Sequence, residues 1–431
     1  MATLLKTPAA WPRILLARAD AKDPTDLDAA VAAGAFDGLR RSIRDLGGAA
    51  TIAAVDASGL RGRGGAGFPT GEKWRIAASA DADRAYVVAN GYGADPASHT
   101  DRTLMRLDPY AVVEGTAIAA FAIGASDAFI AVRAEDTEVT ARLNTAIGAA
   151  TDAGFLGADV LGSGQDLWMT VRPVQGAYML GEETVLLKAL EGKRGQPEQR
   201  PPHPASVGLY DRPTVVNNVQ TLASVPWILR EGADAFRATG STRAPGTVLV
   251  QLRTPAKDGI AEVPLGTPLR DVVKLGGKLA QDRTLQAVLI GGPSGGLLPP
   301  DALDTPYDFV SLREAGAHVG SGSLVAIDDR TNLLELVGVL TRFCSNEACG
   351  KSIPCRIGTK RLAEIVARRE NGLLRPVDTQ LAADLAYDIV ESALCDHERL
   401  ATLPLTSGMR YFGSAFDPAS RRRRVATEAA R

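Results

Sequence analysis

The stretch Ser58–Trp74 reads S-G-L-R-G-R-G-G-A-G-F-P-T-G-E-K-W, and six of its seventeen residues are glycine. Glycine adopts positive φ and lets the backbone approach a bulky ligand where a Cβ would collide. Arg61, Arg63 and Lys73 add cations around backbone donors, as expected for an anionic nucleotide. Flexible linkers are also rich in glycine, but a linker lacks a Phe-Pro-Thr turn followed by Lys-Trp. The stretch therefore predicts a phosphate-cradling loop.

Composition places this loop in a large soluble chain. The 431 residues are 45% hydrophobic, which is enough for two or three domains. The net charge of −2 gives no electrostatic footprint for nucleic acid. The most apolar window, Thr116–Val132, is interrupted by Asp127, and the N-terminus lacks a signal peptide pattern. We expect a cytoplasmic protein with no membrane span of its own.

The residues around the loop predict an α/β sandwich. Arg84–Asn90 is a short apolar run that suits a buried parallel strand, and Ala128–Arg133 and Leu167–Arg172 are two further candidates with helical segments between them. Ligands of open α/β sheets bind at the carboxyl ends of the strands. The segment Gly91–Arg102, which follows the first strand, is therefore a candidate binding loop.

A second motif, Gly176–Gly195, reads G-A-Y-M-L-G-E-E-T-V-L-L-K-A-L-E-G-K-R-G. Glu182 and Glu183 stand where a turn becomes a helix. Two interpretations are open from these residues alone. The acids accept hydrogen bonds from ribityl or ribose hydroxyls, or they only favour the positive end of a helix dipole, worth about 0.3–1 kcal/mol each.

Together the motifs identify a family. The two stretches above, the V-V-N-N-V-Q-T-L run that ends at Leu222, and Asn346–Arg356 (N-E-A-C-G-K-S-I-P-C-R) occur in the order found in the NADH-binding flavoprotein subunit (51 kDa type) of respiratory complex I. The chain resembles a diverged member of that family, whose subunit type NAD-linked formate dehydrogenases and hydrogenases share. The resemblance implies a Rossmann-like FMN/NAD-binding α/β domain, a ubiquitin-like α+β domain and a C-terminal four-helix bundle with an iron-sulfur site. The implied parts are a helical leader 1–45, the FMN/NAD(H)-binding domain 46–240, the ubiquitin-like (soluble-ligand-binding) domain 247–330, the iron-sulfur bundle 331–416 and a basic tail 417–431.

The resemblance also implies cofactors and their ligands. They are FMN, NAD(H) and a 4Fe-4S cluster, with no side chain acting as an acid or base, because the flavin does the chemistry. Flavin is needed because nicotinamide moves two electrons and the cluster moves one. The implied cofactor-binding residues are Gly62, Arg63, Gly64, Gly65, Phe68, Lys73, Asn90, Asp95, Gly181, Glu182, Glu183, Arg200, Asn217 and Asn218.

The chain has four cysteines, and their clustering indicates a metal site rather than disulfides. The segment around Cys349 and Cys355 resembles the family pattern E-S-C-G-x-C-x-P-C-R, and Cys395 takes the place of the fourth ligand. Ser352 stands where the family has its middle cysteine, and serine oxygen is a harder donor than thiolate. Cys344 is the other possible substitute. An intact 4Fe-4S cluster, a 3Fe or serine-ligated variant, and buried thiols without a cluster stay open.

Other departures fall in the nucleotide site. The family loop N-x-D-E-x-E-P here carries Tyr92, Gly93 and Asp95, so FMN loses hydrogen bonds worth roughly 0.5–1.5 kcal/mol each. We expect that the Tyr92 side chain can cover the isoalloxazine ring of FMN. Ile76 and His203 replace aromatic residues of the NADH pocket, which lowers the expected dinucleotide affinity.

Two functions follow. In the first, the chain is a diaphorase-type subunit of a multi-subunit oxidoreductase that exchanges a hydride between NAD(H) and FMN and passes single electrons to the cluster. Its implied partners are a thioredoxin-fold 2Fe-2S subunit and a larger iron-sulfur, formate dehydrogenase or hydrogenase subunit. The alternative is a diverged scaffold or electron-relay subunit that no longer uses NAD(H), because the departures cluster in the cofactor sites. Gly240–Gly246 is expected to be a linker, and His318 a structural or surface residue.

Overall fold

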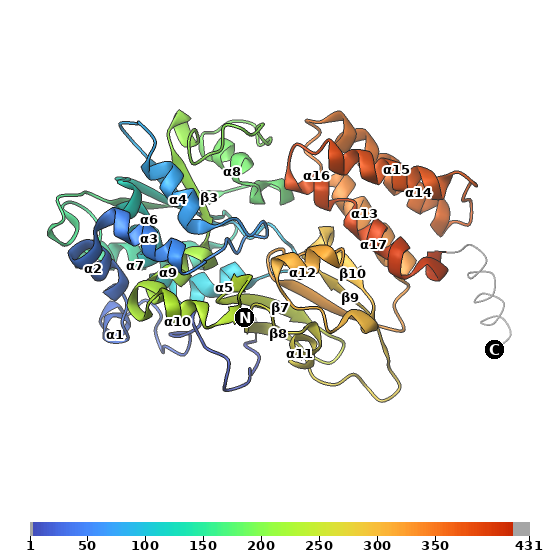
Figure 1. Cartoon of the computed structure of the whole chain (residues 1–431), viewed down its shortest axis with the longest axis horizontal. Coiled ribbons are helices and arrows are strands. Elements are labelled where there is room, and N and C mark those ends of the chain that lie inside the picture. Colours follow the sequence, from blue (N-terminus) through green and yellow to red (C-terminus); the bar gives the residue numbers. More distant parts are fainter. Residues whose placement is uncertain (1–2, 417–431) are drawn as a thin grey trace.

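A four-stranded parallel sheet forms the centre of the N-terminal half in this computed structural model, which describes residues 3–416 (Figure 1). The strands are β1 Tyr86–Gly91, β2 Asp127–Arg133, β3 Trp168–Val174 and β4 Thr214–Asn218. The three strands predicted from the sequence are confirmed. Their spatial order is β3-β2-β1-β4, so the direction of winding reverses between β1 and β4. Such a switch point opens a crevice at the carboxyl ends of the two strands.

Helices cover both faces of this sheet. Successive side chains of a strand point to opposite faces. Val87 and Ala89 of β1 therefore join one buried cluster, whereas Tyr86 and Val88 join another that also contains Leu186. The helices are α1 Leu27–Ala32, α2 Asp37–Arg41, α3 Gly47–Ala57, α4 Thr70–Ala78, α5 Thr100–Leu107, α6 Pro109–Ile123, α7 Thr137–Asp152, α8 Glu183–Leu190, α9 Val219–Glu231 and α10 Ala233–Arg237.

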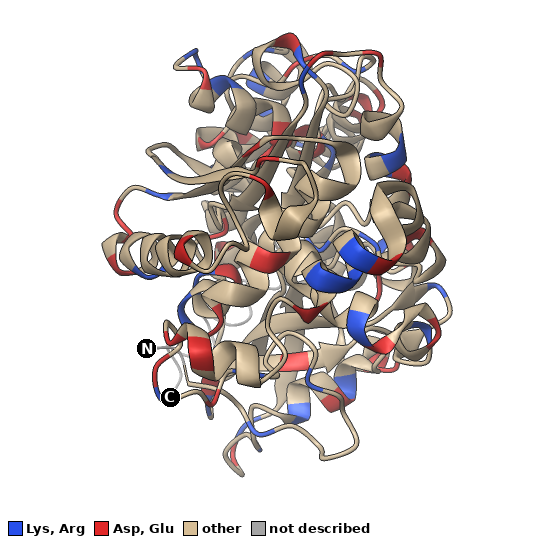
Figure 2. Cartoon of the chain, turned by 90° about the vertical axis from the view of Figure 1, so that its left-hand side faces the viewer, with Lys and Arg blue, Asp and Glu red and all other residues tan. Residues whose placement is uncertain are grey.

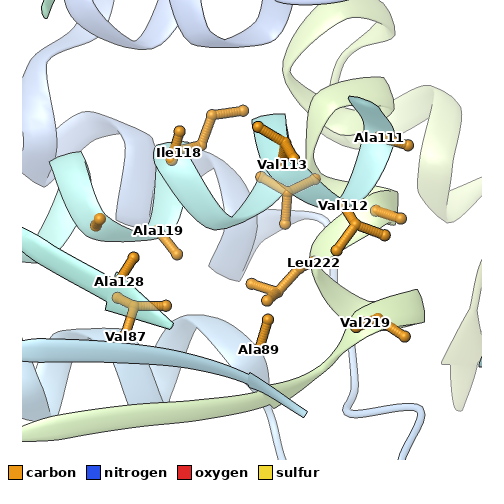
Figure 3. Packing of buried hydrophobic residues seen from close by; sticks show 14 of the residues in the cluster. Val87, Ala89, Ala111, Val112, Val113, Ile118, Ala119, Ala128, Val219 and Leu222 are labelled. Atoms are coloured by element: carbon orange, nitrogen blue, oxygen red, sulfur yellow. The ribbon is translucent and has the colours of Figure 1, made fainter. Parts of the chain in front are cut away.

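Helix α6 is the buried centre of the first cluster, where it packs against the sheet and beside α9 (Figure 3). It begins at an Asp108 N-cap, whose side chain accepts a hydrogen bond from the Ala111 N–H, and it ends at Gly124 in the left-handed region. The apolar window noted in the sequence is thus the end of a core helix followed by β2. Within residues 3–416, no helix is both long enough and apolar enough to cross a bilayer.

Glu114 is a carboxylic acid inside this core. Its side chain has no exposed surface, Oε1 accepts a hydrogen bond from the Leu39 N–H at 3.2 Å, and Oε2 has no partner. Burial raises the pKa of Glu114 to about 7.

Substitution E114Q tests this burial. Between the ordinary carboxyl pKa and pH 7, the unfolded chain has already released a proton that the folded chain keeps, so the contribution of Glu114 to stability falls as pH rises. We therefore expect E114Q to gain stability relative to the wild type between about pH 5 and pH 8. Urea unfolding of both proteins across this range measures the difference. A difference that stays constant with pH would contradict the buried acid.

A second, mixed sheet follows in the chain, with the strand order β10-β9-β11-β7-β8. Its elements are β7 Thr247–Arg253, β8 Asp258–Pro264, α11 Leu269–Lys274, β9 Leu285–Ile290, β10 Gly296–Leu298, α12 Phe309–Glu314 and β11 Ser323–Asp328. The predicted linker is wrong in one respect, because β5 Gly240–Ser241 and β6 Ala244–Pro245 pair as a short antiparallel ribbon. His318 contacts the carbonyl of Ser294, as expected for a structural histidine.

The N-terminal segment ties the two sheets together. Leu4 forms a parallel bridge with Ile260 of β8. The buried Glu262 carboxylate accepts the N–H groups of Ile14, Leu15 and Leu16 at 2.8–2.9 Å. Three backbone donors of an irregular segment are thereby satisfied inside the protein. The segment therefore packs against neighbouring structure, and helices of the implied leader begin only at Leu27.

The C-terminal part is helical and lies beside α8 and the second sheet (Figure 1). Its elements are α13 Leu333–Asn346, the π-helix η7 Pro354–Thr359, α14 Lys360–Glu370, α15 Asp378–Glu391, α16 Asp396–Leu400 and α17 Leu403–Tyr411. The helical character implied for this part of the chain is confirmed. The predicted basic tail lies outside the described residues. The domain boundaries as a whole stay predictions.

Charge is distributed without a dominant sign. Acidic and basic residues are interspersed over the face seen in Figure 2, and the net charge of the chain is −2. Several ion pairs join surface residues that are close in the sequence, such as Arg40 with Asp37 and Arg142 with Glu138. This face has no basic stripe of the kind that binds nucleic acid.

Candidate functional site

The glycine-rich loop folds back on itself before α4 begins. The Gly62 N–H donates to the Phe68 carbonyl at 2.8 Å, and the Thr70 N–H donates to the Leu60 carbonyl at 2.9 Å. Position 67 requires glycine for two reasons. Its φ is +68°, and a Cβ there would lie 2.9 Å from the Phe309 ring. The loop is therefore a fixed structure rather than a linker.

The side chain of Arg63 does not serve the role predicted for it. It is fully buried, and its guanidinium donates to the carbonyls of Arg61, Pro245 and Thr247 at 2.6, 2.6 and 3.0 Å. Burial lowers its pKa to about 9. The prediction that this cation faces an anionic ligand is wrong for the side chain, because the guanidinium fastens the loop to the ribbon and to β7. Whether the Arg63 backbone contacts the ligand stays a prediction.

The loop lies against the switch point between β1 and β4. A Cβ on Gly64 would lie 3.5 Å from the Cβ of Asn218. The Lys73 ammonium donates to the Val216 carbonyl of β4 at 3.0 Å. Asn90, at the end of β1, donates to the Gly181 carbonyl of the second motif at 3.1 Å. Three motifs that are far apart in the sequence thus meet at one crevice.

A chain of alternating charges lines this crevice. Glu183 accepts from Lys73 at 3.0 Å and from Arg200 at 2.9 Å, and Arg200 also pairs with Glu182 at 3.0 Å. Burial opposes ionisation of Glu183, but the charges of Lys73 and Arg200, with a smaller contribution from His203, together outweigh it and lower the pKa of this carboxyl. Burial raises the pKa of Glu182, whose other oxygen caps α8 by accepting the N–H groups of Thr184 and Val185. Glu182 therefore caps the helix and Glu183 faces the cations, and hydrogen bonds from these acids to ligand hydroxyls stay a prediction.

Asn217 and Asn218, the two predicted asparagines, form hydrogen bonds with residues that the sequence analysis did not identify. The Trp74 indole N–H donates to Asn217 Oδ1 at 2.8 Å. Asn218 caps α9 through Oδ1 and donates from Nδ2 to Asp101 at 2.7 Å. The other Asp101 oxygen accepts from Gln220 Nε2 at 2.7 Å. Burial raises the pKa of Asp101 to about 6. Asp101 lies at the start of α5, inside the predicted binding loop. This position was the one sequence feature that could have indicated its role.

Substitution D101N tests this arrangement. The new amide has one oxygen for two donors, so its NH2 group must face the amide of Asn218 or Gln220. We expect the unfolding free energy to fall by about 1–3 kcal/mol, the cost of an unsatisfied buried donor. Urea unfolding measures the change, and D152N at the exposed end of α7 is the control. Equal stability of D101N and D152N would show that the two hydrogen bonds contribute nothing.

Two predicted residues in the segment after β1 have partners of their own. Tyr92 is only 1% exposed, and its hydroxyl donates to the Gly176 carbonyl. It therefore packs in the core and does not cover a flavin, so that expectation is wrong. Asp95 accepts from Ser321 Oγ at 3.0 Å and closely approaches Gly292. Asp95 and Tyr92 line a cavity of about 180 Å³ beside the segment that follows β1.

The predicted dinucleotide pocket keeps one exposed aromatic ring. Phe68 is 42% exposed, and the Lys73 ammonium lies 5.9 Å from its ring centre. Ile76 is partly buried and packs against the first core cluster. His203 is exposed and close enough to Glu183 to contribute to lowering the pKa of that acid, less than Lys73 does. Phe68 thus offers a phenyl ring for stacking and His203 an exposed imidazole, whereas Ile76 offers no ring.

The cysteines lie where the C-terminal helical part meets the first sheet, on the face that carries Tyr86 and Val88. Cys355 and Cys395 are each 3% exposed, and Cys395 belongs to the same buried cluster as Met179 and Leu180 of the second motif. Cys349 packs against this cluster. The three thiols come from the η7 region and the start of α16. Among residues 3–416, no three His, Cys, Asp or Glu side chains converge as they would around a single metal ion.

The donor set fits an iron-sulfur cluster in its chemistry, because soft thiolates are the usual ligands of such clusters. Burial raises the pKa values of the Cys355 and Cys395 thiols to about 12, so iron must displace their protons. Cys344 is fully buried in α13, and its thiol approaches the Pro293 carbonyl at 3.7 Å. That contact gives Cys344 a partner outside the cysteine group.

Comparison with known proteins agrees with this geometry. The Nuo51 FMN-binding domain matches residues 55–227, and the NADH-ubiquinone oxidoreductase-F iron-sulfur binding region matches residues 335–419. The F-type subunit of the NADH-quinone oxidoreductase of Streptomyces coelicolor is 40% identical over 400 residues, which cover 89% of this chain and 88% of the relative. The chain belongs to this family of NADH-quinone oxidoreductase subunits. The corresponding Escherichia coli protein is 34% identical, with 97% of this chain and 94% of the relative covered.

Hydrogenase subunits are also similar to this chain. The HndC subunit of the NADP-reducing hydrogenase of Solidesulfovibrio fructosivorans is 38% identical, with 92% of this chain and 81% of the relative covered. The crystal structure of an NAD+-reducing [NiFe]-hydrogenase in the H2-reduced state matches with a TM-score of 0.83 and 30% identity, covering 96% of this chain and 67% of the other.

These matches decide the class of the protein. It is a diaphorase-type subunit of a multi-subunit oxidoreductase, and its cofactors are FMN, NADH and a 4Fe-4S cluster. The first of the two functional hypotheses is the one that the comparisons favour.

Proposed function

We propose that the crevice between β1 and β4 is the site where NADH and FMN meet in this chain. The observation that carries the proposal is the convergence of Gly64, Lys73, Asn90 and Glu183 at the switch point of the sheet. The bound flavin supplies the exchange between two-electron nicotinamide chemistry and one-electron transfer.

The protein's own part is to bind and orient. Glycines let the loop backbone lie close to the ligand, and Lys73 and Arg200 supply positive charge for phosphate groups. Glu183 holds both cations in place while its lone pairs stay available to ligand hydroxyls. Phe68 offers an exposed ring face for stacking with a base or nicotinamide. In this arrangement no side chain moves a proton.

The second motif suggests a route for electrons from the nucleotide crevice to the cysteines. Gly181 and Glu182 adjoin the crevice, and Met179 and Leu180 of the same motif share a buried cluster with Cys395. Tyr178 bonds the helical part directly, since its N–H donates to Glu347 at 2.9 Å. One short segment thus connects the nucleotide crevice to the cysteines, which supports electron transfer between the two sites.

Exposed apolar side chains support docking of partner subunits on the helical part. Ile353 and Ile357 flank Cys355 and are 67% and 46% exposed, and Tyr387 of α15 is 66% exposed. Exposed apolar residues beside a redox centre suit an interface that accepts electrons. We assign this face to the larger iron-sulfur subunit of a hydrogenase, formate dehydrogenase or complex I-like assembly. A thioredoxin-fold 2Fe-2S subunit is the second proposed partner, on the family resemblance alone.

An NADH titration tests the function. The complex is purified anaerobically with its natural partners, and the visible flavin band is followed as NADH is added. We expect NADH to bleach the band. A flavin that dithionite reduces and NADH leaves oxidised would overturn NADH as the donor, and a preparation without flavin would overturn the site.

Substitution K73M tests the crevice itself. Loss of the ammonium leaves Glu183 paired with Arg200 and removes a charge-assisted contact to the phosphate, so we expect FMN affinity to fall about tenfold. Titration of the apoprotein with FMN measures the affinity. K274M, on the exposed side of α11, is the control. If both variants bind FMN equally, Lys73 does not belong to the site.

A further inference from the structure

The first half of strand β7, in the second sheet, bonds to side chains of the N-terminal half. Strand β11 pairs with β7 from Gln251 onward. Before that point, the Thr247 carbonyl accepts a hydrogen bond from the Arg63 guanidinium at 3.0 Å, and the Leu249 N–H donates to Oε1 of Gln220 at 2.9 Å. Two side chains thereby satisfy backbone groups that a neighbouring strand would otherwise pair.

Gln220 connects β7 to the crevice. It lies in the first turn of α9, two residues after the N-cap Asn218, and it has no exposed surface. Besides the bond from Leu249 to Oε1, its Nε2 donates to Asp101 Oδ1 at 2.7 Å and to Thr100 Oγ1 at 3.2 Å. Both ends of the amide are therefore occupied, and its orientation is fixed by β7 on one side and by α5 on the other.

Both walls of the crevice are thus fastened to a single strand. The glycine-rich loop is held at Thr247 through Arg63, and the end of β4 is held at Leu249 through Gln220 and its partner on α5. A strand rises by roughly 3.3 Å per residue, so the two anchor points are about 7 Å apart. None of the predicted cofactor-binding residues belongs to β7. The contribution of this strand is therefore to the spacing of the two walls.

We propose that Gln220 is a positioning residue for the flavin, which holds Asn218 at the distance from the glycine-rich loop that FMN requires. The inference rests on the proposed function, which places FMN in the crevice between β1 and β4. Gln220 acts through Asp101, whose other oxygen accepts the Asn218 amide. A binding group must be held to within about 0.5 Å of its productive place, so a small displacement of Asn218 weakens a ligand that also bonds to the loop.

A purely structural role is the alternative, because a buried amide with three hydrogen bonds also stabilises the fold. The two roles differ in what they predict for FMN. If Gln220 only stabilises the fold, the FMN affinity of the folded protein does not depend on it. If Gln220 positions Asn218, FMN affinity falls even where the variant is fully folded.

The pairing of an amide with an acid allows an exchange experiment. Q220E alone sets two carboxylates against each other, and D101N alone sets one amide NH2 group against another. In the double variant Q220E/D101N the acid and the amide have changed places. The carboxylate at position 220 then accepts from the Leu249 N–H and from the amide at position 101, which still offers its oxygen to Asn218.

The full-length apoproteins are titrated with FMN in the absence of urea, and urea unfolding is measured on the same samples. We expect Q220E and D101N each to weaken FMN binding about tenfold, and Q220E/D101N to bind within about threefold of the wild type. Should Q220E fail to fold, Q220M replaces it as the single variant at this position, because it removes the hydrogen bonds without burying a charge. The same tenfold loss is expected for Q220M.

Two controls accompany these variants. Gln380 and Asp384 form the same kind of pair on the exposed side of α15, where Nε2 donates to Oδ1 at 2.7 Å. Q380E, D384N and their double variant are expected to bind FMN like the wild type. V272A removes buried methyl groups from the core that contains Val250, on the face of the second sheet away from Leu249. It is expected to lose stability and to keep its FMN affinity.

The proposal is overturned by any of three results. Q220E or Q220M binds FMN as tightly as the wild type, the double variant is as weak as the product of the two single effects, or V272A weakens FMN binding as much as Q220E does. K73M is titrated alongside. A wild type that binds no FMN, or that binds it no better than K73M, overturns the proposed site and the inference with it. A K73M defect without a Q220E defect overturns the positioning role of Gln220 alone.

Discussion

Substitution G115A is expected to unfold much of the N-terminal domain at concentrations of urea that leave the wild type folded. Gly115 lies where α6 crosses α9, and an added Cβ would lie 2.0 Å from the Leu222 carbonyl oxygen and 2.4 Å from its carbon. Both atoms belong to backbone, so no side-chain rotation relieves the overlap and one helix must shift. Ordinary overpacking costs about 1–3 kcal/mol, and we expect this substitution to cost about 3 kcal/mol or more.

The displacement also reaches the crevice. Asn218 is the N-cap of α9, so a shift of this helix moves the end of β4 against which the glycine-rich loop lies. We therefore expect G115A to retain less FMN than the wild type, even in the fraction that stays folded. Urea unfolding followed by circular dichroism, together with flavin content after gel filtration, measures both effects.

The matched control is Gly148, which also lies inside a helix, α7. An added Cβ there meets nothing within 4 Å. G148A is expected to stabilise the domain by up to about 1 kcal/mol, because alanine has the higher helix propensity. Equal unfolding curves for G115A and G148A would mean that α6 and α9 are not packed as closely as the structure has them.

The sequence alone predicted the strands of the first sheet well, because those signals are local. Apolar runs marked β1, β2 and β3 to within two residues. The glycine positions and the Glu182–Glu183 pair marked two loops whose meeting point then follows from sheet topology. Lys73 and Asn90 lie at this meeting point, where the sequence placed them.

The directions of individual side chains were not predictable in the same way. Arg63 and Tyr92 follow glycine-rich or loop residues, which leaves both a ligand-facing and a core-facing orientation open. The choice depends on the Pro245 carbonyl for Arg63 and on the Gly176 carbonyl for Tyr92, partners more than eighty residues distant in the chain. Asp101 and Gln220 were missed for a related reason, since each becomes significant only through a partner from another segment.

Arg63 offers the strongest test of such an orientation, through the substitution R63K. The lysine keeps the positive charge, but its single ammonium cannot span the three carbonyls of Arg61, Pro245 and Thr247 as the planar guanidinium does. At least one buried carbonyl and part of a cavity remain. Hydrogen bonds to charged groups contribute about 1.5–3 kcal/mol each, so we expect R63K to lose about 3 kcal/mol of unfolding free energy.

The same substitution distinguishes two roles of Arg63: holding the glycine-rich loop in place, and binding an anionic ligand. If Arg63 acted on a phosphate, lysine would largely replace it, and FMN affinity and stability would stay near wild-type values. If Arg63 fastens the loop, stability falls first, and FMN affinity falls with it because the loop loses its anchor on β7. Arg75 is the control, since R75K changes an arginine that is 55% exposed and pairs with Asp56 on the surface of α4. Exposed pairs contribute about 0–1 kcal/mol, so R75K is expected to match the wild type in both urea unfolding and FMN titration. The glycine-rich loop would then owe its shape to a buried arginine that never meets the nucleotide.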